Sequence, residues 1–193
     1  MFKKAFTLIE LMIVLAIIAI LAAVLIPKAV TFKTEAKNAG VVTNVKTIRC
    51  YLEPMAVYSS YDSDDAKEIQ TKLKSTFTIY NHTENIDNAL YNPFTGKIGY
   101  MSNNIDYLYY TGTKVNNINH NYLNGSFYLA IFDCTVKPKT TTQVTVPSVL
   151  DNSTLGKFTK DNQGVTFVYI YSDGIVVFGL DNNNSVIGAQ VIK

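Results

Sequence analysis

The stretch from Leu11 to Ile26, LMIVLAIIAILAAVLI, contains sixteen apolar residues without a break. Counted from Phe6, the apolar run is 21 residues long and is interrupted only by Thr7 and Glu10. As a helix rising about 1.5 Å per residue it would span roughly 31 Å, the thickness of the hydrocarbon core of a bilayer. A strand of this length without alternating polarity would be anomalous. The run therefore predicts a helix long enough to cross a membrane.

Three kinds of segment have such a run: a membrane anchor, a cleaved secretory signal and a buried core helix. A signal has an apolar core of about 7–15 residues and a small-residue cleavage site. Ala22 and Ala23 would serve as that site, but this core is longer and contains Glu10. A buried core helix rarely lacks polar residues over four turns. Lys3 and Lys4 precede the run, so the positive-inside rule places the N-terminus in the cytoplasm.

The composition of the remaining chain excludes several classes of protein. The 193 residues are 48% hydrophobic and 17% charged, which excludes disorder by composition. The formal net charge of +2 gives no reason to expect nucleic-acid binding. Cys50 and Cys134 match no zinc or redox spacing, so we expect no metal and no cofactor.

Glu10 is the unusual residue of the apolar run. An ionised carboxylate deep in a membrane helix costs about 2.5–3.5 kcal/mol on insertion scales, so such a residue normally has a function and a partner. The residues three and four positions away carry no positive charge. We therefore expect the partner of Glu10 to come from another chain or from a newly formed N-terminus.

The segment Lys3–Glu10, KKAFTLIE, followed by the apolar run and Pro27, resembles the start of a type IV prepilin of the type IVa class. The resemblance implies that a prepilin peptidase cuts between Ala5 and Phe6 and that the new amine of Phe6 is methylated. It also implies that Glu10 is needed for filament assembly. The family usually has Gly before the cut, whereas this chain has Ala5.

The same resemblance implies a division of the chain into four parts. They are a leader (1–5), a transmembrane or filament-core helix (6–27), the amphipathic half of the same helix (28–53) and a globular head (54–193). The implied fold is α+β, with the long helix packed on a C-terminal antiparallel sheet. The implied partners are other pilin subunits, the prepilin peptidase, and an assembly ATPase with its membrane platform. The protein would be a single-pass membrane protein before assembly and part of a surface pilus afterwards.

Beyond Pro27 the sequence continues in a helical pattern. Pro27 lacks an amide proton, so we expect a kink or local loosening there, or simply the exit from the membrane. The next apolar residues are spaced 4, 3 and 4 apart and share one face: Val41, Val45, Ile48 and Leu52. Gly40 is either a second flexible point or a close-packing contact. Pro54 ends the predicted helix, which runs from Phe6 to about Glu53.

The sequence of the head predicts a connecting region followed by a sheet. Asp64 or Ser63 would cap a short helix that ends near Ser75, and Asn92–Gly96 (NPFTG) predicts a turn. Strands are predicted at 126–132 and 165–171, and the latter begins a three-stranded meander with turns at 172–174 and 181–184. We expect one apolar face of this sheet to cover the helix.

Cys50 and Cys134 leave two alternatives open: a disulfide between helix and sheet, or two buried thiols. Many pilins of Gram-negative bacteria have a C-terminal disulfide loop, which this chain lacks. That difference favours a Gram-positive source, such as a clostridium.

No residues argue for an enzyme. His82 and His120 have no metal-ligand spacing, and no nucleophile, zinc or phosphate-loop motif is present. We therefore expect a structural pilin subunit for adhesion, motility or colonisation. The alternatives are a pseudopilin of a type II secretion or DNA-uptake system and a membrane-anchored binding module that does not polymerise.

Overall fold

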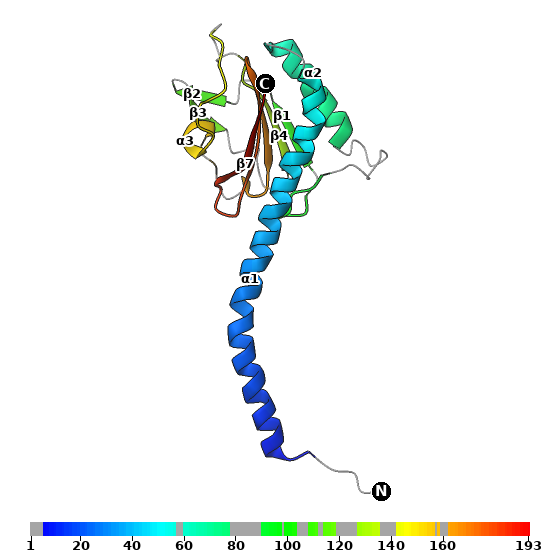
Figure 1. The fold of residues 1–193 in the computed structure, drawn as a ribbon, viewed down its shortest axis with the longest axis vertical. Helices are drawn as coiled ribbons and strands as arrows, with labels where there is room; N and C mark the ends of the chain where they lie inside the picture. Colours follow the sequence, from blue (N-terminus) through cyan, green and yellow to red (C-terminus); the bar gives the residue numbers. More distant parts are fainter. Residues whose placement is uncertain are drawn as a thin grey trace. The chain divides into compact units, whose positions relative to one another are not determined.

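The computed structural model describes residues 6–56, 60–77, 90–97, 99–103, 108–111, 114–118, 127–135, 142–156, 158 and 162–193. The chain divides into two compact units, Met1–Ala36 and Lys37–Lys193, which are treated separately below. From here on, the head means the whole second unit, which also contains the last part of α1 before the predicted head of residues 54–193 (Figure 1). The helices are α1 (Leu8–Leu52), the 3₁₀ turn η1 (Glu53–Met55), α2 (Ser63–Phe77) and α3 (Asn152–Leu155). The strands are β1 (Gly99–Asn103), β2 (Leu108–Thr111), β3 (Lys114–Ile118), β4 (Phe127–Asp133), β5 (Thr166–Tyr171), β6 (Gly174–Leu180) and β7 (Val186–Ile192).

The predicted long helix is present as α1, a single helix of 45 residues that continues through Pro27. All of its buried residues lie in the head: Val41, Asn44, Val45, Ile48 and Leu52. The predicted 4-3-4 apolar face is therefore confirmed. Pro54 lies in the 3₁₀ turn that follows α1, so the helix ends where Pro predicts an end.

The head contains a five-stranded sheet in the order β1-β4-β5-β6-β7 and a two-stranded sheet of β2 and β3. The predicted meander is confirmed, because β5, β6 and β7 pair antiparallel. The expectation of an antiparallel sheet throughout is wrong, because β4 pairs parallel with both β1 and β5. Parallel neighbours need a long crossover connection, which the segment between β4 and β5 supplies. The strands β1, β2 and β3 lie in a stretch for which no strand was predicted.

The five-stranded sheet is apolar on both faces, not on one as predicted. The face toward α1 and α2 packs Leu129, Ile131, Val168, Ile170 and Val177 against Val45, Ile48 and Leu52 of α1. Alternate residues of the same strands form a second core on the opposite face, under the segment around Val144 and Leu155. The aromatic members of this second core are Phe132, Phe158, Phe167, Tyr169, Tyr171 and Phe178. The strands β5 and β6 are accordingly buried at every position.

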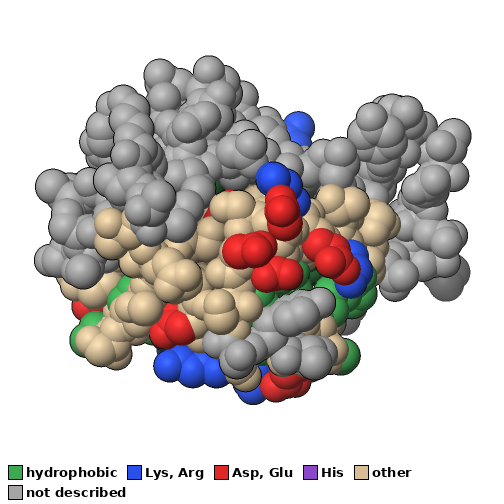
Figure 2. Space-filling model, turned by 90° about the horizontal axis from the view of Figure 1, so that it is seen from above, with side chains coloured by type: hydrophobic (Ala, Val, Ile, Leu, Met, Phe, Trp, Pro, Cys, Tyr) green, Lys and Arg blue, Asp and Glu red, His purple; other side chains and the backbone are tan. Residues whose placement is uncertain are grey.

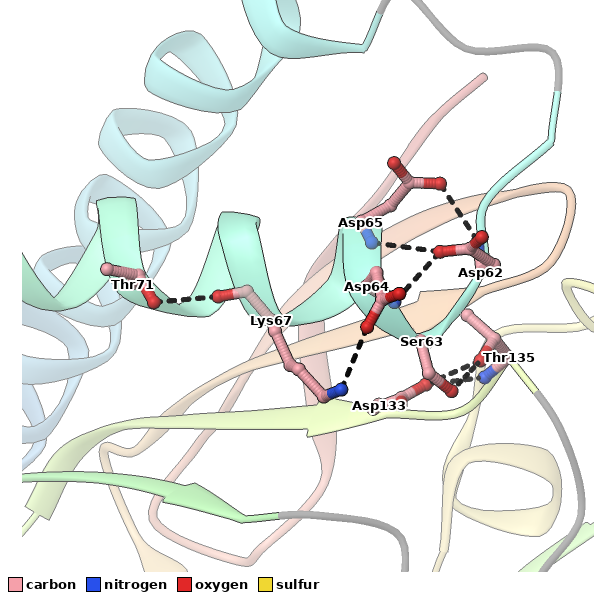
Figure 3. Close-up of polar contacts among 8 residues, drawn as sticks. All are labelled: Asp62, Ser63, Asp64, Asp65, Lys67, Thr71, Asp133 and Thr135. Atoms are coloured by element: carbon pink, nitrogen blue, oxygen red, sulfur yellow. Dashed lines mark hydrogen bonds and ion pairs between the residues drawn. The ribbon is translucent and has the colours of Figure 1, made fainter.

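Helix α2 confirms the predicted short helix, but its cap is Asp62 rather than Ser63 or Asp64. The Asp62 carboxylate accepts hydrogen bonds from the backbone N–H groups of Asp64 (2.8 Å) and Asp65 (3.0 Å) (Figure 3). The Asp65 carboxylate accepts one from the N–H of Asp62 at 3.0 Å, which completes a reciprocal cap. The bonds from the Asp65 and Asp64 N–H groups lower the pKa of Asp62. Ile69 and Leu73 are buried on the inner face, as predicted.

The predicted turn at Asn92–Gly96 is confirmed, and it packs against α1. The buried Asn92 side chain accepts a hydrogen bond from the N–H of Phe94 at 2.8 Å and donates one to the Gln163 carbonyl at 2.7 Å. A Cβ atom added at Gly40 would lie 3.0 Å from the Pro93 ring. Of the two alternatives for Gly40, the close-packing contact is therefore the one that the structure supports.

The described part of the head has a polar surface. Among its described residues, only Tyr91 and Val149 are large apolar side chains with more than half of their surface exposed. Figure 2 shows acidic and basic side chains side by side on one face of the molecule. This head surface is typical of a part that faces water.

Candidate functional site

The first turn of α1 is held by a reciprocal cap between Thr7 and Glu10. The Glu10 carboxylate accepts hydrogen bonds from the backbone N–H of Thr7 at 2.8 Å and from its hydroxyl at 2.6 Å. The N–H of Glu10 donates to the Thr7 hydroxyl at 3.3 Å. This is a capping box, in which residues N-cap and N3 satisfy each other's free backbone N–H groups.

The cap supplies the Glu10 carboxylate with hydrogen bonds but not with a counterion. It gives the carboxylate two donors within its own turn. It brings no positive charge, because within the described chain no cation pairs with Glu10. Lys3 and Lys4 lie outside the described residues, as does Ala5 of the predicted cleavage site. A charge without a counterion in an apolar helix is strongly unfavourable unless a partner arrives from elsewhere.

The apolar run that contains this site is exposed within the chain itself. Helix α1 is long and apolar enough to cross a membrane, and the 18-residue window that meets this criterion is 0% buried. Phe6, the predicted first residue after cleavage, is 85% exposed. An exposed apolar surface of this size marks a segment that lies in lipid or against other protein.

Pro27 lies inside α1, with helical residues on both sides. Its missing N–H leaves the Ala23 carbonyl without the usual helical donor. Close by, the hydroxyls of Thr31 and Thr34 donate to the carbonyls of Pro27 (3.2 Å) and Val30 (3.1 Å). Such back-bonds slightly weaken a helix and often bend it. The predicted kink or loosening at Pro27 stays a prediction.

The structure contains no disulfide between Cys50 and Cys134. Cys50 is exposed on α1, whereas Cys134 belongs to the second core, on the face of the sheet opposite to α1. The alternation of side chains along β4 explains the separation: Leu129 and Ile131 point toward α1, and Ala130, Phe132 and Cys134 point away. Of the expected pair of buried thiols, only Cys134 is buried.

The remaining candidate residues are two histidines. His82 and His120 lie outside the described residues. In the part of the chain that is described, no three His, Cys, Asp or Glu side chains come together as metal ligands.

Sequence reasoning identified Glu10 but missed Thr7. The signal was present in the sequence, because Thr7-Leu8-Ile9-Glu10 has the spacing of a capping box directly before an apolar run.

Comparison with known proteins identifies this first segment. Residues 1–26 match the family model described as the prokaryotic N-terminal methylation motif. Part of this chain is similar to type IV pilins. The type IV major pilin protein PilA of Myxococcus xanthus is 46% identical over 69 residues, which cover 35% of this chain and 30% of the relative. The type IV wide pilus major component PilA4 of Thermus thermophilus is 45% identical over 74 residues, covering 38% of this chain and 56% of the relative.

These matches cover the N-terminal motif and at most 38% of the chain, so they leave most of the head uncompared. The chain spans between about a third and somewhat more than half of the length of these two relatives. Both relatives are named as pilus components, and neither name describes an enzyme. Neither comes from a clostridium, so the comparison does not support the expected source. No solved structure matched the chain.

Proposed function

We propose that this protein is a subunit of a type IV pilus and that it assembles through the apolar part of α1. The observation that carries the proposal is Glu10, the only carboxylate in an exposed apolar run. It is capped by Thr7 and has no counterion among the residues that the structure describes. The matched methylation motif and the two pilin relatives support the same function.

Processing supplies the missing counterion. Cleavage between Ala5 and Phe6 removes Lys3 and Lys4 with the leader and creates an amine at Phe6. A methylated amine stays protonated at neutral pH, so it can neutralise the Glu10 carboxylate of a neighbouring subunit. Because a buried ion pair mainly fixes register, most of the association energy comes from the apolar helices.

The geometry of assembly follows from the use of one helix for all contacts. Contacts between different surfaces of successive subunits generate an open fibre when the rotation between subunits does not close a ring, and this is the arrangement proposed here. Before assembly the same helix crosses the membrane, with the N-terminus in the cytoplasm as Lys3 and Lys4 predict. The prepilin peptidase, an assembly ATPase and its membrane platform are the proposed partners, and adhesion, motility or colonisation is the proposed use.

Two substitutions at Glu10 test the proposal, since they separate the charge from the cap. Glu10→Gln keeps a side chain that serves in a capping box but removes the charge, whereas Glu10→Ala removes both. We expect both variants to lose surface filaments while the head stays folded, as measured by electron microscopy of sheared fibres and by circular dichroism. The control is Glu35→Ala, an exposed carboxylate of the same helix beyond the apolar run.

The outcomes distinguish the alternatives. Wild-type filament levels in both Glu10 variants would contradict the proposed role of Glu10. Absence of filaments in the wild type would favour the membrane-anchored binding module. Filaments confined to a secretion or DNA-uptake apparatus would indicate a pseudopilin.

A further inference from the structure

Strand β7 is the last strand of the five-stranded sheet. At the start of its outer edge, a side chain makes hydrogen bonds of the kind that a neighbouring strand would make. The Asn152 amide donates from Nδ2 to the Asn184 carbonyl at 2.6 Å and accepts at Oδ1 from the N–H of Val186 at 2.8 Å. One planar amide thus makes the donor and acceptor contacts that a paired backbone would make.

These contacts lie on the outer side of β7, away from β6. Leu180 is the partner of Val186 in the β6–β7 register. Both backbone groups of Leu180 bond toward β5: its N–H donates to Val165 (3.2 Å), and its carbonyl accepts from Gly164 (3.0 Å). The Leu180–Val186 pair is therefore one without mutual hydrogen bonds, and the N–H of Val186 points away from β6.

A local cap fixes the residue that makes these contacts. Asp151 caps α3, accepting hydrogen bonds from the backbone N–H (2.8 Å) and the hydroxyl of Ser153. Asn152 is the first residue of α3 and is held at the start of β7 by this cap. Figure 1 shows α3 and β7 on the same side of the head.

The edge that Asn152 covers is of the kind that pairs with other chains. The sequence of β7, VIGAQVI, has no charge and no Pro. An unpaired edge strand of this composition is a template for strand addition, and segments of this length and type are prone to self-pairing. In the described part of the chain no strand pairs with this edge.

We propose that Asn152 closes the start of the outer edge of β7, at Val186, against pairing with a second copy of this chain. The inference rests on the proposed function in one respect: a filament holds many heads at high local concentration, where an open edge would add unwanted head-to-head contacts.

The test uses the full chain in detergent micelles, where no filament is needed. Asn152→Ala removes both bonds and Asn152→Asp keeps only the acceptor. The control is Asn183→Ala, in the turn that contains Asn184. We expect amide exchange at Val186 to become roughly two- to tenfold faster in Asn152→Ala. We also expect concentration-dependent self-association by light scattering, with a smaller effect in Asn152→Asp and none in the control.

A second substitution shows whether the association uses this edge. Val186→Pro removes the outward N–H without removing a bond to β6, so Asn152→Ala with Val186→Pro should be monomeric again. Unchanged exchange at Val186 in Asn152→Ala would overturn the proposal, as would faster exchange with no self-association. If Asn152→Ala does not fold, Asn152→Asp and its Val186→Pro double variant decide in the same way. This experiment does not measure filament formation, on which the Glu10 variants are judged. Failure of one proposal is therefore distinguishable from failure of the other.

Discussion

Apolar side chains have opposite surroundings in the two regions of the molecule. In the region up to Ala36 they are exposed within the chain, as Leu15 is at 57%. In the head the same residue type is enclosed, as Leu52 is at 0%, and two cores fill both faces of the sheet. The difference shows that the head can be stable on its own contacts. The first region needs lipid or other subunits to cover it.

Truncating one leucine in each region should produce the largest contrast. Leu52→Ala removes a fully buried side chain and is expected to lower the free energy of unfolding of the head by about 2–5 kcal/mol. Leu15→Ala should leave that free energy unchanged. Urea unfolding in detergent, followed by near-UV circular dichroism of the buried tyrosines, measures both. Equal losses in the two variants would contradict the division into two regions.

Close packing within the head predicts the next largest effect. A Cβ atom at Gly179 of β6 would overlap Cγ1 of Val41 on α1. Gly179→Ala should therefore destabilise the head by about 1–3 kcal/mol. Adding Val41→Ala removes the obstructing methyl group and should restore part of the loss, measured as a coupling energy in a double-mutant cycle. Strict additivity of the two substitutions would show that the contact is not tight.

The capping box predicts a smaller and local effect in the first region. Thr7→Ala removes the cap side chain, which costs about 1 kcal/mol of helix stability. Amide exchange in the first turn of α1 should become roughly fivefold faster, while unfolding of the head is unaffected. Thr7→Ser keeps the hydroxyl and is the control. No change in first-turn exchange in Thr7→Ala would show that Glu10 does not use this cap.

The smallest predicted effect is a pH dependence of α3. The hydroxyl and N–H of Ser153 stabilise the Asp151 carboxylate and lower its pKa below the usual value. Its contribution is therefore complete above about pH 4 and is lost as the pH falls through the lowered pKa. Amide exchange at Ser153 should show this loss in wild type. Asp151→Asn, which caps without titrating, should not show it.

The sequence predicted the parts of this fold that depend on local periodicity. The spacing of Val41, Val45, Ile48 and Leu52 identified the buried face of α1, and turn residues located the β5–β7 meander. The second core was missed because one face of the sheet was assumed to be polar. The near-continuous apolar run TFVYIY of β5 is typical of a strand buried on both sides.

Other features depend on contacts between distant residues and had no local signal. The parallel pairing of β4 with β5 joins segments separated by a long crossover. The hydrogen bonds of Asn152 join it to Asn184 and Val186, which are 32 and 34 positions away in the sequence. At the candidate site, the sequence identified Glu10, because an ionised carboxylate in an apolar run has a high free-energy cost. Thr7 was missed although the capping-box spacing is local.

The mass and N-terminal sequence of the protein sheared from the cell surface test the central claim most directly. The account predicts fibres whose subunit begins at a methylated Phe6. A subunit that still begins at Met1, or one that begins after Ala23, would contradict the account. The first result would indicate a membrane-anchored domain and the second an exported one.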